Sequence, residues 1–480
     1  MQKREEKKFV VTGPITGGKH GWPRLSYLGD ISKIGYVEEE YFIEGEAATF
    51  HPQGEMTLDG KWTLRKEGGT PYKTRFLVQR PIDAKKFNGS VIIEWLNVSL
   101  GYETTMTHGT GTYENGFAIV YATVQNRGIH GEGLGLAQWD PQRYGSLHIA
   151  NDWISYDIFT QIAQAVGPNR DTKQVDPMGG LQVKRLIANG YSHSGCSIVS
   201  YANGIQPIEH TFDAYLPTVC GLYTAFDDAS NQEMLNRIQK GSSPKASPEE
   251  RKQIFIGSLI RDDLDVPVFY INTEYETKTV KFSAQPDTER VRVWSVAGSP
   301  HLSRGPRYQD LYVSLRDGIT QPEFIDRYVQ VSYIAVMDAA LVHLNRWIDE
   351  KIAPPIFPQI ESDETGRVIR DEFGNAKGGI RLPELEVPIA TYISEMGMTV
   401  QKPQTDMGIN IPMPCYGGYQ FDFPREKLAQ LYKDHDEYVS KVTAAAQKAY
   451  KQGIILESRV KAYTEWAEAQ PVPKQNVVYM

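Results

Sequence analysis

The sequence KRLIANGYSHSGCSI, residues 184–198, decides the fold of this chain. It starts with an apolar run of strand length, turns sharply after Asn189, and continues into residues typical of a buried helix. A serine at such a strand-to-helix turn has a strained backbone and an exposed hydroxyl, and the positive end of the helix dipole lies beneath it. The pattern therefore predicts a nucleophile elbow with Ser192 as the nucleophile.

The elbow motif departs from the usual Gly-x-Ser-x-Gly pattern at one position. Ser194 stands where the second glycine is expected, and Gly195 follows it. Centring the motif on Ser194 gives Ser-x-Ser-x-Cys, which fits less well, so Ser192 is preferred. Cys196 lies inside the predicted helix and is interpreted as a small buried residue rather than a reactive thiol. The alternative interpretation is that the segment is only a tight turn.

The composition bounds the class of protein. The chain has 480 residues, 40% of them hydrophobic, which is enough for one large domain with insertions or two closely packed ones. Its net charge of -8 argues against a nucleic-acid surface. No apolar run reaches the roughly 18 residues of a membrane span, and the charged start lacks the apolar core of a secretory signal. Cys196, Cys220 and Cys415 are too widely spaced for a disulfide framework or a zinc site, so we expect a cytoplasmic protein without a metal.

Apolar runs separated by turn signals predict an alternation of strands and helices, which is typical of an α/β domain with a mostly parallel sheet. Strands are predicted at 36–43, 72–81, 90–95, 117–124, 184–189, 214–220, 265–272 and 291–296, and helices at 152–166, at 322–350 and within 425–455. The glycine-rich stretch 128–135 lacks the spacing of a phosphate-binding loop and is predicted to be a flexible loop.

Changes in composition along the chain predict its domain organisation. Residues 1–75 form an N-terminal β-rich segment packed on the core, and residues 76–350 form the α/β core. A polar insertion at about 225–263 is predicted to be a helical lid. From 351 to 480 the recurrent prolines and glycines indicate a C-terminal extension.

Three residues with complementary chemistry follow predicted strands. Ser192, Glu276 and His301 occur in the order nucleophile, acid, base, which is the chain order of α/β-hydrolases. The carboxyl ends of parallel strands meet at one crevice, so the three side chains can come together. Histidine can accept and return the serine proton near neutral pH, and a carboxylate orients it. Other histidines could act as the base, but none of them follows the last strand: His108, His130, His148 and His193.

The acid has an alternative. Glu274 lies two residues before Glu276, and side chains two apart on an extended segment point the same way. Glu276 is preferred because it lies further beyond the strand end.

An oxyanion hole needs two backbone N–H donors. One is expected from His193, directly after the nucleophile, and the other from Val98 or Asn97 in the loop after the strand at 90–95. The aromatic residues expected to bind substrate are Trp95, Tyr102, Tyr191 and Tyr275, which favours an apolar or aromatic acyl or alcohol group.

Several segments resemble the alpha/beta hydrolase domain family of bacterial and fungal esterase-like proteins. The distinctive ones are Glu-Trp-Leu-Asn-Val at 94–98 and Gly-Asn-Ala-Lys-Gly-Gly-Ile-Arg-Leu-Pro at 374–383, and the similarity runs from about 30 to 470; further matching segments are 155–159, 190–195, 272–276 and 296–301. The resemblance implies an α/β-hydrolase fold, a Ser–acid–His triad, and a C-terminal extension at 351–480 that lies over the active-site side. It implies no metal, phosphate or nucleotide site.

The function expected from these features is hydrolysis of a small carboxylic ester by a serine hydrolase that forms an acyl-enzyme. No cofactor, nucleic acid or membrane is expected to take part, and no oligomeric state is predicted. Lactone or amide hydrolysis and acyl transfer are alternatives on the same triad. A non-catalytic ligand-binding protein on a hydrolase scaffold is a further one, for which Ser194 is the only hint.

Overall fold

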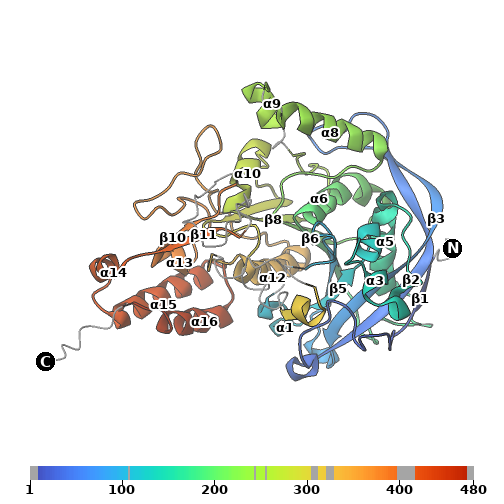
Figure 1. The fold of residues 1–480 in the computed structure, drawn as a ribbon, viewed down its shortest axis with the longest axis horizontal. Helices are drawn as coiled ribbons and strands as arrows, with labels where there is room; N and C mark the ends of the chain where they lie inside the picture. The colour runs from blue at the N-terminus through green and yellow to red at the C-terminus, as the bar shows by residue number, and fades with distance from the viewer. Residues whose placement is uncertain are drawn as a thin grey trace.

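The structure is a computed structural model, and it describes residues 9–105, 109–173, 175–242, 245–253, 257–303, 312–319, 329–396 and 417–472. A single nine-stranded sheet crosses the molecule in the order β1-β2-β3-β5-β4-β6-β7-β8-β9 (Figure 1). Its strands are β1 Phe9–Thr12, β2 Tyr36–Pro52, β3 Leu64–Pro81, β4 Ser90–Trp95, β5 Ala118–Ala122, β6 Arg185–Tyr191, β7 Ala214–Thr218, β8 Val268–Thr273 and β9 Val291–Val296. The pairs from β5 through β9 are parallel, and the pairs from β1 through β3 to β5 are antiparallel.

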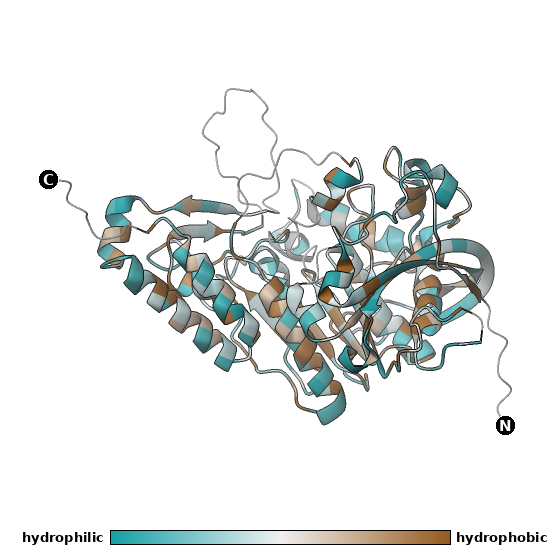
Figure 2. Ribbon diagram, turned by 90° about the horizontal axis from the view of Figure 1, so that it is seen from below, coloured by the Kyte–Doolittle hydropathy of each residue, from teal (hydrophilic) through white to brown (hydrophobic). Residues whose placement is uncertain are grey.

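The parallel strands are apolar on both faces because helices cover both faces. All six residues of β4 are buried. Val91 and Ile93 join one apolar cluster with α5 Ser155–Val166 and α6 His193–Ser200, whereas Ile92, between them, joins another with α12 Ile334–Glu350. This period of two is what a pleated strand between two helical layers requires. Figure 2 shows brown and teal residues alternating along the helices, as helices with one face on a core require.

The N-terminal strands are part of the central sheet. β2 and β3 form a long hairpin that pairs from Tyr36 with Pro81 to Pro52 with Leu64, and β3 pairs onward with β5. The boundary expected at residue 75 therefore falls inside a strand. Both strands extend well beyond the predicted stretches. Cross-strand charges support the pairing, as where Lys73 Nζ lies 2.9 Å from Glu44 Oε2.

The remaining helices connect the strands and build the C-terminal part of the molecule. They are α1 Thr110–Glu114, α2 Asn126–His130, α3 Leu136–Trp139, α4 Pro141–Tyr144, α7 Gln206–Glu209, α8 Asp228–Ser242, α9 Pro248–Gln253, α10 Thr277–Ser283, α13 Pro383–Glu386, α14 Arg425–Leu431, α15 His435–Lys451 and α16 Glu457–Glu468. One-turn 3-10 helices are η1 Ile31–Ile34, η2 Ala84–Lys86, η3 Asp152–Ile154 and η5 Glu274–Glu276, and a π-turn, η4 Tyr201–Ile205, continues α6. A second, two-stranded sheet pairs β10 Ala390–Ile393 with β11 Tyr419–Asp422.

Two of the predicted elements are wrong in part. The helix predicted at 322–350 begins only at Ile334; residues 320–328 lie outside the described part. Val329, Val331 and Tyr333 are fully buried at alternate positions, which is a strand-like rather than a helical period. The stretch 128–135 is not a flexible loop, because α2 runs through its first residues and a Cβ at Gly131 would lie 2.3 Å from the Gly101 carbonyl oxygen. Its glycines permit close packing.

The insertion at about 225–263 contains α8 and α9 (Figure 1). It contacts the connection between β2 and β3, where the Leu259 N–H donates to the Leu58 carbonyl at 2.7 Å. It also contacts η3, where Trp153 Nε1 donates to Asp228. Its role as a lid stays a prediction.

Candidate active site

The elbow has a strained backbone at Ser192. This residue lies between β6 and α6 with φ 57° and ψ -125°, a conformation that L-residues rarely adopt. Its N–H donates to the Thr218 carbonyl of the neighbouring β7 at 3.0 Å, which holds the turn against the sheet. Ser192 is half-buried, whereas Tyr191 before it and Ser194 two residues after it are buried.

Small residues around Ser192 make this turn possible. A Cβ at Gly190 would lie 2.8 Å from the Ser194 carbonyl carbon, and one at Gly195 would lie 2.9 Å from the Thr218 carbonyl oxygen. Ser194, at the irregular position of the motif, is fully buried and compact enough for the site. A nucleophile has to be accessible to substrate, and the buried Ser194 is not.

Ser192, His301 and Glu276 form a hydrogen-bonded chain. His301 Nε2 lies 2.9 Å from Ser192 Oγ, and His301 Nδ1 lies 2.5 Å from Glu276 Oε1. Glu276 Oε2 in turn accepts from the Thr273 N–H at 3.1 Å and the Thr273 hydroxyl at 2.5 Å. His301 and Glu276 are 7% and 3% exposed, so bulk water screens their interaction weakly.

The two glutamates point in different directions. Residues 274–276 form the 3-10 turn η5 rather than an extended segment, so side chains two apart do not share a side. Glu274 is fully buried and accepts from Arg370 Nη2 at 2.8 Å, the Ser394 N–H at 3.0 Å and the Gly298 N–H at 2.9 Å. Glu274 therefore lies outside the chain of Ser192 and joins the C-terminal extension to the loop before His301.

The loop that carries His301 is braced by the C-terminal extension. Ile380 bridges to β9, donating to the Ser295 carbonyl at 2.7 Å, and its carbonyl accepts from Ala297 at 2.9 Å. Leu385 covers Gly298, where a Cβ would lie 2.7 Å from the leucine. Burial opposes the charge of Arg370, but the carboxylates of Glu274 and Glu395 outweigh it and raise the pKa of Arg370.

The expected oxyanion donors are placed differently from one another. His193 is the first residue of α6, so its N–H is one of those that a helix leaves without an intrahelical acceptor. The Asn97 N–H donates to the Thr104 carbonyl at 3.1 Å, and Asn97 Nδ2 donates to the Tyr191 carbonyl at 3.1 Å. These bonds occupy the Asn97 N–H, and Val98 stays the alternative for the second donor.

The four aromatic residues expected to bind substrate have different surroundings. Trp95 packs against Tyr156 and Phe159 in the core, so the expectation that it contacts substrate is not supported. Tyr102 is buried with Arg24 over its ring. Tyr191 is buried and bonds to Thr104 through its hydroxyl. Tyr275 is the one of the four beside the histidine, with its ring centre 5.1 Å from that of His301.

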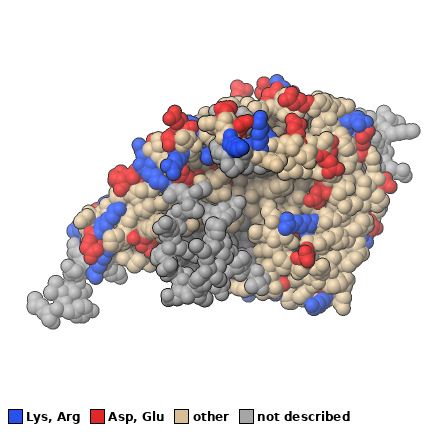
Figure 3. Space-filling view, turned by 45° about the horizontal axis from the view of Figure 1, so that its top comes forward, with Lys and Arg blue, Asp and Glu red and all other residues tan. Residues whose placement is uncertain are grey.

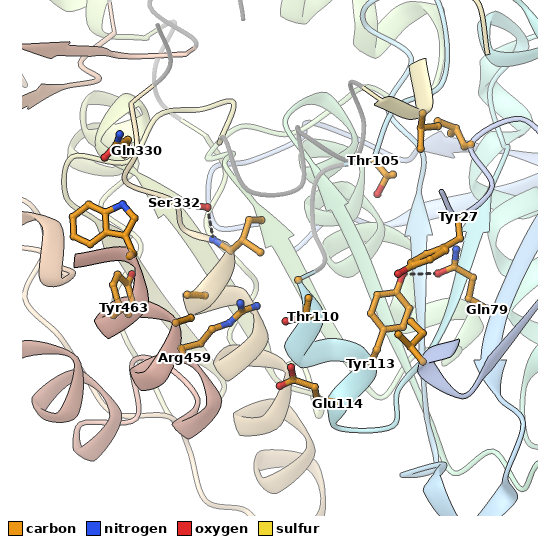
Figure 4. Close-up of a pocket in the computed structure, with 18 of the residues that line it drawn as sticks. Tyr27, Gln79, Thr105, Thr110, Tyr113, Glu114, Gln330, Ser332, Arg459 and Tyr463 are labelled. Carbon is orange, nitrogen blue, oxygen red and sulfur yellow. Dashed lines mark hydrogen bonds between the residues drawn. The ribbon is translucent and has the colours of Figure 1, made fainter. Parts of the chain in front are cut away.

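A pocket of about 620 Å³ is lined by residues of the α/β core and of the C-terminal extension. Figure 4 shows Arg459 of α16 reaching toward Thr110 of α1, with Tyr113 and Gln79 on the opposite wall, where the Tyr113 hydroxyl donates to Gln79 at 2.7 Å. Sequence reasoning missed this pocket because its walls come from segments far apart in the chain. The tyrosines and the tryptophan of its walls carry no local motif.

Charged residues are interspersed on the face shown in Figure 3, with lysines and arginines beside aspartates and glutamates. Within the described residues, His, Cys, Asp and Glu side chains form no group of three or more that could hold a metal ion. None of the described helices combines the length and the apolarity that crossing a membrane requires.

A strained serine between a parallel strand and a helix, followed by an acid and a histidine at the ends of later strands, defines the α/β-hydrolase class of fold. The chain belongs to the alpha/beta hydrolase domain family, whose model matches residues 11–465. The family and the fold class expected from the sequence are thereby confirmed.

Comparison with solved structures finds several distantly similar esterases. Esterase Est22 has 13% identity and a TM-score of 0.29, over 60% of this chain and 82% of that chain. Est1E from Butyrivibrio proteoclasticus has 12% identity and a TM-score of 0.28, over 57% and 96%. A glucuronoyl esterase from Solibacter usitatus has 9% identity and a TM-score of 0.27, over 66% and 87%. No curated protein sequence matches this chain.

Proposed function

We propose that this protein is a serine hydrolase that cleaves a carboxylic ester, with Ser192 as nucleophile, His301 as base and Glu276 as orienting acid. The observation that carries the proposal is the chain from Ser192 Oγ to His301 Nε2 at 2.9 Å and from His301 Nδ1 to Glu276 Oε1 at 2.5 Å. The chain begins at a serine whose backbone is held at φ 57°. Strain at a position that aims a hydroxyl outward is a feature of reactive sites.

The proposed reaction has two steps. Ser192 Oγ attacks the ester carbonyl while His301 Nε2 accepts its proton, and the negative oxygen receives hydrogen bonds from the N–H groups of His193 and Val98. The same proton then passes to the leaving alcohol, which leaves the acyl group on Ser192. Water, deprotonated by His301, attacks the acyl carbonyl in the second step, and the proton returns to Ser192 as the acid departs. Glu276 stabilises the imidazolium in both steps.

The test is labelling by a fluorophosphonate, which reacts covalently with an activated serine, followed by intact-mass measurement. We expect one adduct on the wild type and on Ser194→Ala, and none on Ser192→Ala. An adduct that persists in Ser192→Ala but is lost in Ser194→Ala would move the nucleophile to Ser194. Absence of an adduct from the folded wild type would contradict a serine hydrolase.

The second test addresses the bond that is cleaved. Esters, lactones and amides of matched size are offered to the wild type with and without a competing alcohol. We expect free acid from the esters as the main product. Transfer of the acyl group to the alcohol as the main product would replace hydrolysis by acyl transfer.

A further inference from the structure

The pocket of about 620 Å³ is linked to the elbow and to the histidine loop by two hydrogen bonds. Thr105 lines it and directly follows Thr104, whose hydroxyl is hydrogen-bonded to that of Tyr191, the residue before Ser192. Ser332 also lines it, and its hydroxyl lies 2.5 Å from that of Ser303, two residues after His301. Two independent segments of the pocket wall are therefore hydrogen-bonded to the residue before the nucleophile and to a residue two positions after the base.

The walls are mainly aromatic and aliphatic. Tyr27 and Tyr113 stand edge to face, with ring centres 6.2 Å apart, and Tyr463 and Trp466 of α16 add two further rings. Such walls favour a flat apolar group, because ring faces and edges attract one another beyond the gain from burial. The volume lies within the usual range for small-molecule sites, roughly 300–1,000 Å³.

In one carboxyl group of this pocket, one oxygen has no hydrogen-bond partner among the described residues. Glu384 is 6% exposed, and Tyr463 donates to it, but its Oε2 has no hydrogen-bond partner among the described residues. A buried acceptor left unpaired is unfavourable by about 1–3 kcal/mol, and a ligand that donates a hydrogen bond would remove that cost. Burial raises the pKa of Glu384 to about 7.

Ionisable groups of both signs line the pocket, namely Arg459, Glu114 and Glu384. Arg459 lines the pocket, with Nη2 2.6 Å from Asp338 Oδ2 and its Nε unpartnered among the described residues. A cationic ligand would meet this guanidinium, and an anionic one would meet Glu384. A neutral hydroxyl avoids both repulsions and can donate a hydrogen bond to Glu384 Oε2.

We propose that this pocket binds a neutral hydroxyaryl group of the ester, with its hydroxyl donating to Glu384 and its ring against Tyr113, Tyr463 and Trp466. The assignment rests on the proposed function, since it places part of the substrate of Ser192 in the pocket. It also gives the C-terminal extension a part in specificity, because α13 and α16 supply Glu384 and two of the rings.

Binding is measured on Ser192→Ala, so that the probes are not consumed. The probes are methyl 3-(4-hydroxyphenyl)propanoate and methyl 3-phenylpropanoate, which differ by one hydroxyl. Isothermal titration calorimetry should show about tenfold tighter binding of the hydroxylated ester, the effect of one good hydrogen bond. Equal affinities would overturn the role of Glu384.

Two variants in the Ser192→Ala background and a matched control locate the site. Glu384→Met should remove the preference for the hydroxyl. Ala462→Trp, which places a large ring at the pocket wall, should weaken both probes about tenfold or more. Lys461→Trp adds the same ring at the neighbouring exposed residue that does not line the pocket, and it should leave both affinities unchanged. If Ala462→Trp binds both probes as well as the control does, the pocket is not the site.

The two proposals fail in different ways. Fluorophosphonate labelling of Ser192 in Glu384→Met and Ala462→Trp, with Ser192 intact, reports the nucleophile alone. Normal labelling with no preference for the hydroxyl overturns the pocket and leaves the hydrolase. A hydroxyl preference that depends on Glu384 and Ala462, with no labelling of the wild type, supports the pocket as a binding site and overturns the hydrolase.

Discussion

At the scale of single residues, the environment separates side chains of the same type. Ser192 and Ser194 are two residues apart, yet one lies at the strained turn beside His301 and the other is fully buried. Glu274 and Glu276 are equally close, and one accepts from Arg370 whereas the other accepts from His301. Chemical role in this protein thus depends on the direction that each short turn gives to its side chains.

The first prediction concerns the acid. Glu276→Gln should lower kcat for p-nitrophenyl acetate on the order of 10⁴-fold, because an amide cannot stabilise the imidazolium and favours the wrong tautomer of His301. The matched control is Glu274→Gln, which should keep kcat within about tenfold, since the Glu274 carboxylate accepts from Arg370 and from backbone N–H groups. Its altered pairing with Arg370 should lower stability. A larger loss of kcat in Glu274→Gln than in Glu276→Gln would reverse the assignment.

At this scale, catalytic candidates could be predicted from the sequence only where their order along the chain, after successive strands, identifies them. Ser192 and His301 are found from their positions after strands. The choice between Glu274 and Glu276 depends on a single 3-10 turn, and one turn of 3-10 helix leaves no hydrophobic period in the sequence. The preference for Glu276 agrees with its contact to His301, but residues 274–276 form a 3-10 turn and not the extended segment that was expected.

At the scale of elements, the C-terminal extension supports the loop between β9 and His301. Ile380 continues the sheet as a bridge to Val296, and Arg370 reaches the buried Glu274. The extension therefore holds the base of the candidate triad from outside the α/β core. An interaction of this kind contributes to stability and to activity together.

The second prediction removes this support. Arg370→Met leaves the Glu274 carboxylate buried without its cation, which should lower the free energy of unfolding by about 3–5 kcal/mol. Urea unfolding measures the loss, and the rate of fluorophosphonate labelling should fall with it as the loop loosens. Arg367→Met, three residues earlier on the exposed surface, should change the unfolding free energy by less than about 1 kcal/mol. Equal stability of the two variants would show that the Arg370 contact is not needed.

Elements were predicted well where burial is uniform. The strands at 90–95 and 291–296 coincide with β4 and β9, because continuous apolar runs are typical of strands covered on both faces. Prediction was poorer where polar residues or glycines take part in packing. The ends of the β2–β3 hairpin and the helix at Asn126–His130 were missed for that reason.

At the scale of the whole molecule, the N-terminal strands β1–β3 and the C-terminal helices α14–α16 lie on opposite sides of the parallel strands (Figure 1). The N-terminal strands extend the sheet at one edge, and the C-terminal helices cover a face near the other. The pocket is assembled from both ends, with Tyr27 on one wall and Tyr463 and Trp466 on another. No local pattern could predict it, since these residues are more than 400 positions apart in the sequence.

This assembly makes stability depend on pH through Glu384. Its pKa is raised by burial from 4.5 to about 7 in the folded chain, so the folded state binds a proton more tightly than the unfolded state. The resulting stability is fully present below about pH 4.5 and is lost as the pH rises through about 7. The loss is about 3 kcal/mol, at about 1.4 kcal/mol for each pKa unit.

The third prediction follows from this loss of stability with rising pH. Between pH 5 and pH 8 the wild type should lose unfolding free energy, and Glu384→Gln should lose about 3 kcal/mol less, because the amide does not ionise. Urea unfolding at the two pH values measures the difference. Glu386→Gln, at an exposed position two residues further along α13, is the matched control and should keep the pH dependence of the wild type. If Glu384→Gln and Glu386→Gln lose equal stability between the two pH values, the Glu384 carboxyl reaches water in the folded protein, and the pocket then has no unpaired oxygen to offer a ligand.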